Sequence, residues 1–93
     1  MATQNFSTAT TTYNVAVGFS AGAAVTTGVN NTLIGSLAGD AMTDADENVA
    51  VGLASIGTNV LGSSSTAIGT YALAAQNPAT AVDMYNVAVG HTA

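Results

Sequence analysis

The chain has 93 residues with no Lys, Arg or Cys, five acidic residues and one His, and its formal net charge is -5. Because no basic side chain can neutralise phosphate, we expect no nucleic-acid partner and no attraction to an anionic membrane surface. The lack of Cys excludes disulfides and thiolate metal ligands, and we expect no cofactor. The hydrophobic content of 48% includes 19 Ala, so the core of one copy is thin and self-association is favoured.

Residues 1–12 precede the patterned part of the chain and are uncharged and rich in Thr. They have neither the basic start nor the apolar stretch of a secretory signal peptide. No run of about 20 apolar residues that could span a bilayer follows them. We predict an N-terminal arm over 1–12, able to add a strand to a neighbouring subunit or shell, and one repeat domain over 13–93.

A repeat of 17 residues organises this domain. The repeats are NVAVGFSAG, NTLIGSLAG, NVAVGLASI, STAIGTYAL and NVAVGHTA; they begin at Asn14, Asn31, Asn48, Ser65 and Asn86, at spacings of 17, 17, 17 and 21 residues. A fixed period without a 3.6-residue apolar pattern predicts an all-β parallel solenoid of about five coils and excludes a helical fold.

The three residues before the glycine of each repeat alternate with the period of a β-strand. In the first repeat, Val15 and Val17 would point to one side and Ala16 to the other. We expect the β-branched side to lie inside the coil. The opposite side also lacks the polar residues of a solvated strand face, so we expect it to face another copy. The candidates for that interface are Ala16, Leu33, Ala50, Ala67 and Ala88.

Glycine and asparagine recur at fixed places in the repeats. The glycines are Gly18, Gly35, Gly52, Gly69 and Gly90, and they fit corners that end each strand, where φ is positive or another coil passes closely. The asparagines are Asn14, Asn31, Asn48 and Asn86, with Ser65 interrupting the series. They predict either a ladder in which each side chain bonds to its equivalent one coil away, or separate turns that tolerate a left-handed backbone.

The motif resembles the 17-residue repeat of tail-fibre and other structural proteins of bacteriophages, and it is similar to the head repeat of trimeric autotransporter adhesins. The resemblance covers residues 13–93. It implies a left-handed β-roll in which three chains associate side by side. Departures from the pattern lie at 44–47, at Ser65 and in a four-residue insertion within 77–85. The interior residues that it implies are Val15, Val17, Ile34, Val49, Val51, Ile68, Val87 and Val89.

No pattern of residues indicates catalysis, and we expect a protein that is not an enzyme. His91 is the only His. It is expected to be a solvated terminal residue, and the alternative is a metal site formed by the imidazoles of three copies. The acidic cluster Asp40, Asp44, Asp46 and Glu47 lacks the spacing of a calcium-binding loop and is expected to be a solvated corner. The aromatic residues beside the motif either cap the ends of the stack or stack on sugars: Tyr13, Phe19, Tyr71 and Tyr85.

Two functions remain after these exclusions. The first is a structural virion protein, either a fibre segment or a capsid decoration, that acts as a rigid homotrimer and contacts other virion proteins. A virion protein is made in the host cytoplasm and needs no export signal, which favours this location. The alternative is an extracellular adhesin head that binds a host receptor or glycan through edge aromatics and the loop at 77–85, which contains Pro78.

Overall fold

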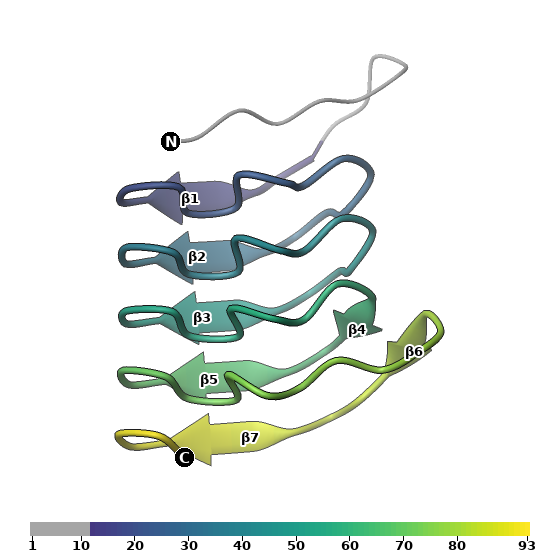
Figure 1. The fold of residues 1–93 in the computed structure, drawn as a ribbon. Helices are drawn as coiled ribbons and strands as arrows, with labels where there is room; N and C mark the ends of the chain where they lie inside the picture. Colours follow the sequence, from purple (N-terminus) through teal and green to yellow (C-terminus); the bar gives the residue numbers. More distant parts are fainter. Residues whose placement is uncertain (1–11) are drawn as a thin grey trace.

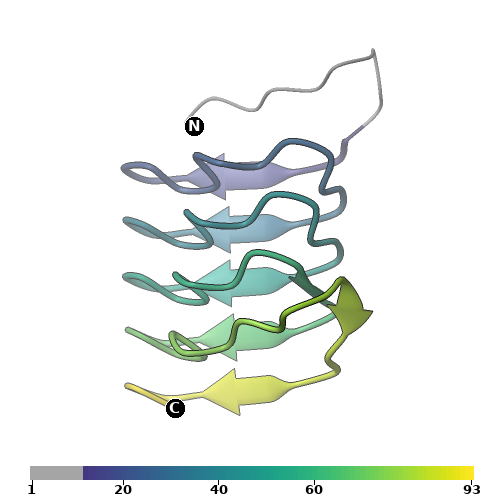
Figure 2. The ribbon, with the colours of Figure 1, turned by 45° about the vertical axis from the view of Figure 1, so that its right-hand side comes forward.

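The structure, a computed structural model, describes residues 12–93, so the predicted arm lies outside the described residues except for Thr12. The described chain is an all-β parallel solenoid without helices (Figures 1 and 2). Its main sheet has the strand order β1-β2-β3-β5-β7. These strands are Val15–Val17 (β1), Thr32–Ile34 (β2), Val49–Val51 (β3), Thr66–Ile68 (β5) and Val87–Val89 (β7).

The register of the main sheet confirms the 17-residue repeat. Val15 pairs with Thr32, Thr32 with Val49, and Val49 with Thr66, each pair being one repeat apart. Thr66 then pairs with Val87 across the longer spacing of the last repeat. Five strands therefore enclose four complete turns of the solenoid. We call each main-sheet strand together with the segment that follows it a coil, and we number the coils from the first at β1 to the fifth at β7.

A second, two-stranded sheet shows where the insertion lies. Its strands are Gly62–Ser63 (β4) and Val82–Asp83 (β6), which pair in parallel beside the main stack (Figure 1). Gly62 pairs with Val82, and 82 minus 62 is 20, three more than the repeat. Thr66 pairs with Val87, and 87 minus 66 is 21, four more than the repeat. Three extra residues therefore precede β6, and one follows it.

The prediction of which strand side faces inward was wrong. Ala16 is 6% exposed and Leu33, Ala50 and Ala67 are at most 1% exposed, so these predicted interface residues lie inside the coil, with Ala88 half-buried on the same side. Val15 and Val17 are 49% and 56% exposed. All the predicted interior residues are at least partly exposed: Val15, Val17, Ile34, Val49, Val51, Ile68, Val87 and Val89.

The narrow interior of the coil explains this reversal. A short closed coil leaves little volume between its walls, so mostly small side chains fit on the inner side of the strands. Leu33 is the exception, and its Cδ atoms occupy the space that a Cβ would need at Gly22 (2.9 Å) and Gly39 (2.8 Å). The positions equivalent to Gly39 in the next two coils carry Ile56 and Leu73. In those coils the inward strand residues are the small Ala50 and Ala67. In the second to fourth coils a large residue on one wall is thus matched by a small residue on the other.

The glycine that follows each main-sheet strand has a positive φ, and in the first four coils the next coil also passes closely, as predicted. Gly18 has a φ of 127°, and a Cβ on it would lie 2.7 Å from the backbone of Gly35 in the next coil. Gly35, Gly52 and Gly69 make the same approach at 2.5–2.7 Å. Gly90 has a similar φ of 134°, but the nearest atom to its hypothetical Cβ is Ala93 Cβ at 3.8 Å. A side chain at this position in any of the first four coils would therefore push neighbouring coils apart.

Other positions of the turns adopt a left-handed backbone without glycine. One column immediately precedes the asparagine ladder, and its φ values lie between 51° and 61°: Tyr13, Asn30, Glu47, Ser64 and Tyr85. A second follows the corner glycines with φ between 54° and 62°: Ser20, Leu37, Ala54, Tyr71 and Thr92. Each such residue costs about 1 kcal/mol of strain. Because unlike residues share one conformation, the stack imposes the turn geometry.

The glycine contacts yield a prediction that separates coil contact from backbone strain. We expect Gly18→Ala to reduce the free energy of unfolding by about 2 kcal/mol more than Gly90→Ala, because both alanines are strained but only the first meets the next coil. Both glycines lie in end coils, so position in the stack is matched. Urea unfolding followed by circular dichroism measures the difference; equal losses would contradict the proposed contact.

Candidate interaction surface

One face of the solenoid is apolar, uncharged and uncovered. The outward side chains of the five main-sheet strands form it, and we call it the outer sheet face: Val15, Val17, Thr32, Ile34, Val49, Val51, Thr66, Ile68, Val87 and Val89. Parallel sheets are normally covered on both faces, and large exposed apolar patches mark interaction sites. This face is therefore the candidate functional site of the described chain.

The charges of the molecule are kept away from this face. All five acidic residues lie at other positions of the coil: Asp40, Asp44, Asp46, Glu47 and Asp83. The only polar side chains on the outer sheet face are Thr32 and Thr66, and neither is charged. A second copy could cover this surface without burying an unpaired charge, which is the largest electrostatic penalty an interface can carry.

The acidic corner at 44–46 bonds to the preceding coil. Asp44 Oδ1 accepts hydrogen bonds from the hydroxyls of Thr26 (3.2 Å) and Thr27 (2.7 Å). Asp46 Oδ1 accepts one from the backbone N–H of Val29 (2.8 Å), one coil earlier. Asp44 is exposed, as expected of a solvated corner, but these carboxylates also tie neighbouring coils together. Among residues 12–93, no three His, Cys, Asp or Glu side chains lie close enough to hold a metal ion.

The asparagine series forms the predicted ladder, and its donors are backbone groups. Asn14 Oδ1 accepts from the backbone N–H of Asn31 at 2.8 Å, and Asn31 Oδ1 accepts from that of Asn48 at 2.9 Å. The Nδ2 group of Asn48 donates to the carbonyl of Gly62 at 3.0 Å. Asn31 and Asn48 are fully buried, so each amide links successive coils where water cannot compete. The alternative of separate left-handed turns fails, because the positive φ belongs to the residue before each asparagine.

Gln76 repairs the ladder where Ser65 interrupts it. The backbone N–H of Ser65 still donates to Asn48 Oδ1 at 2.9 Å, but its short side chain does not reach the next coil's backbone. Gln76 Oε1 instead accepts from Ser65 Oγ at 3.2 Å and from Asn86 Nδ2 at 2.7 Å, while its Nε2 donates to Asn59 Oδ1 at 3.4 Å. Sequence reasoning missed Gln76. The sequence does contain a signal for it. Equivalent positions in the first two coils carry the apolar Val25 and Met42, whereas those in the next two carry the polar Asn59 and Gln76.

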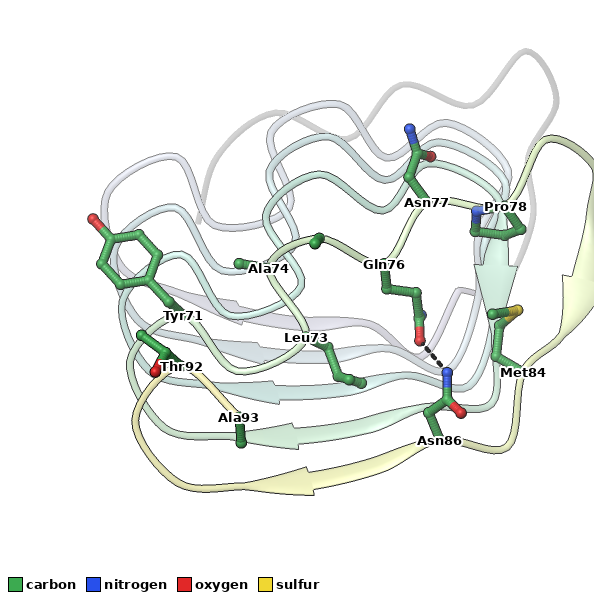
Figure 3. A pocket seen from close by; sticks show the side chains of 11 residues that line it. Tyr71, Leu73, Ala74, Gln76, Asn77, Pro78, Met84, Asn86, Thr92 and Ala93 are labelled. Atoms are coloured by element: carbon green, nitrogen blue, oxygen red, sulfur yellow. Dashed lines mark hydrogen bonds between the residues drawn. The ribbon is translucent and has the colours of Figure 1, made fainter.

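A pocket of about 640 Å³ opens between the fourth and fifth coils (Figure 3). The hydrogen bond between Gln76 and Asn86 lies at this pocket, and the exposed ring of Tyr71 lies at its edge. No charged side chain lines it, so it offers neutral amides, hydroxyls and apolar surface, without an acid, base or nucleophile pair for catalysis. Its lining residues are Tyr71, Leu73, Ala74, Ala75, Gln76, Asn77, Pro78, Met84, Asn86, Thr92 and Ala93.

The remaining predicted site residues lie apart on the surface. Tyr13 and Phe19 in the first coil are 75% and 76% exposed, and Tyr85 before the last strand is 76% exposed. The Tyr85 hydroxyl donates to Asp83 Oδ2 at 3.3 Å. His91 is exposed in the fifth coil. The structure does not bring these residues together at one site.

Comparisons of the chain with protein-family models, with curated proteins and with solved structures found no match. No helix in the described part of the chain is long and apolar enough to cross a membrane.

The buried ladder yields a second prediction. Replacing Asn48 with Ala removes the acceptor for the Ser65 N–H, which is left unpaired in a buried position. It also removes one of the two donors to the Gly62 carbonyl, which keeps its bond from Asn59 Nδ2 at 2.7 Å. We expect a loss of about 1–3 kcal/mol in the free energy of unfolding, chiefly from the unpaired N–H. The control is Asn77→Ala, which removes one exposed bond of 3.3 Å to Val60 and should cost less than about 1 kcal/mol. Urea unfolding of both variants measures this; similar losses would contradict the ladder's stabilising role.

Proposed function

We propose that this protein is a non-enzymatic structural subunit that associates with copies of itself, as a homotrimer, through the outer sheet face. The observation that carries the proposal is the uncharged β-branched surface on five strands, with every carboxylate placed elsewhere. Covering such a surface removes apolar area from water and supplies stability that a core made largely of alanine lacks. Regular coils joined by buried amides make the subunit a rigid building block.

The proposed place of this subunit is a virion, as a fibre segment or a capsid decoration in contact with other virion proteins. The support is the resemblance of its repeat to that of phage fibre proteins, together with a fold that suits a mechanical role. A chain without Lys and Arg also has no cleavage site for a trypsin-like protease. These properties are useful to a particle exposed outside a cell.

The assembly state tests this proposal directly. We expect the protein to sediment as a trimer at micromolar concentration, and Ile68→Asp to shift it toward the monomer, because the substitution buries a charge in the interface. Ala23→Asp is the control, since Ala23 is exposed and the equivalent position one coil later already carries an acidic residue, Asp40. Sedimentation equilibrium of the three proteins measures the masses. A folded wild-type monomer at all concentrations, or equal effects of the two substitutions, would refute the proposal.

The second candidate function is that of an adhesin head that binds a neutral glycan. The pocket with Tyr71 at its edge and the amides of Gln76, Asn77 and Asn86 favours it, because sugars bind to aromatic rings and neutral hydrogen-bonding groups. If it is right, glycan-array binding by the wild-type protein will be lost in Tyr71→Ala but retained in Phe19→Ala, which changes an aromatic residue outside the pocket. Absence of binding to any neutral glycan would exclude it.

A further inference from the structure

The outward residues follow a second, longer period of two coils. In the first, third and fifth coils the outer sheet face carries Val and Val, whereas in the second and fourth it carries Thr and Ile. The two residues after each corner glycine alternate as well. We call them the corner pairs: Phe19–Ser20, Ser36–Leu37, Leu53–Ala54, Thr70–Tyr71 and His91–Thr92. The larger residue comes first in odd coils and second in even coils.

Each corner pair therefore contains one large and one small side chain. The pairs stack in register, because the N–H of Leu37 donates to the carbonyl of Phe19 at 2.8 Å and the N–H of Tyr71 to that of Leu53 at 2.8 Å. They form two adjacent columns along the solenoid, with large side chains changing column at every coil. None of the ten residues is buried, and Phe19, Leu53 and Tyr71 are 76%, 40% and 45% exposed.

The fold of one chain does not require this alternation. The inward columns show no two-coil period: the strand column is Ala, Leu, Ala, Ala, Ala, and the two columns across the interior are Ala21, Ala38, Ser55, Ala72 and Gly22, Gly39, Ile56, Leu73. Left-handed φ values in the second corner column are alike for Ser20, Leu37 and Ala54, so the backbone does not select the larger residue. The alternation is thus confined to residues that face away from the chain's own core.

We propose that the corner pairs are the register-setting part of the interface between copies, in which the first residue of each pair packs against the second residue of the same pair in a neighbouring copy. The inference rests on the proposed self-association. With the copies parallel and their coils level, a large side chain meets a small one in all five coils. The partner is a second copy of this chain. A large first residue is always accompanied by a small second residue in the same pair, and the reverse, so an identical chain offers the matching size at every coil.

The two-coil period also defines which arrangements are excluded. A neighbour displaced along the axis by one coil, about 4.8 Å, would place Phe19 against Leu37 and Ser36 against Ala54. Large residues would then oppose large ones and small residues small ones. Overpacked contacts and voids both weaken an interface, so the alternation selects the level arrangement over the slipped one.

A cycle of substitutions in the third coil tests the pairing. Ala54→Leu makes both members of the pair large, and we expect it to raise the dissociation constant of the trimer at least about tenfold. Leu53→Ala makes both small and should weaken association similarly. The double variant Leu53→Ala with Ala54→Leu restores one large and one small residue and should return to within about threefold of the wild type. Sedimentation equilibrium measures the constants.

The sign of the Ala54→Leu effect separates this pairing from general hydrophobic attraction, which predicts tighter association when apolar surface is added. Leu37 shows that the column accepts leucine at a φ of 62°, and circular dichroism at low concentration checks the fold. Ser20→Leu makes the pair in the first coil doubly large and provides a second variant with the same expectation. Unchanged or tighter association of both variants, or a double variant as weak as the singles, would overturn the pairing while leaving self-association intact. A wild-type monomer would overturn both.

Discussion

The close approach of glycine backbones in successive coils is the constraint on which the rest of this structure depends. At each corner a Cβ would come within 2.5–2.7 Å of the next coil's backbone, so the column from Gly18 to Gly69 admits no side chain. This contact brings the strand ends to β-sheet spacing and makes every coil superimpose on the one before. Columns of equivalent residues follow from it, and so does the small cross-section that limits what fits inside.

Strain in the turns is offset by hydrogen bonds that run between coils. Two columns of non-glycine residues hold a left-handed backbone in every coil, and together they represent a substantial cost. The ladder from Asn14 to Ser65 lies directly beside one of these columns and pairs buried donors and acceptors from coil to coil. No buried side-chain polar atom in the described residues lacks a partner. A single coil has neither the ladder nor the glycine contact, and stability is therefore a property of the stack.

Spacing in the sequence predicted the periodic features of the fold but not their orientation. The repeat length, the strands before each glycine, the absence of helices and the insertion near Pro78 were predicted correctly, because each depends on intervals between residues. Alternation alone does not say which side of a strand is inside. The prediction that Val fills the core and Ala faces a partner is wrong, because the narrow coil admits Ala16 and Ala50 and leaves Val15 and Val49 outside. Gln76 was missed because its bonding to Ser65 and Asn86 crosses the irregular coil, where no interval predicts contact.

The reversed orientation changes the physical basis of assembly. If alanines had formed the contact surface, association would depend on close backbone approach and little apolar area. With β-branched residues outside, the main-sheet strands expose most of their larger hydrophobic side chains and bury mainly alanines, the opposite of a self-sufficient domain. In the proposed assembly, a large part of the free energy from apolar burial would come from contacts between copies. On this proposal the chain reaches its full stability only when its outer sheet face is covered, while its carboxylates stay on the remaining sides of the coil, where water solvates them.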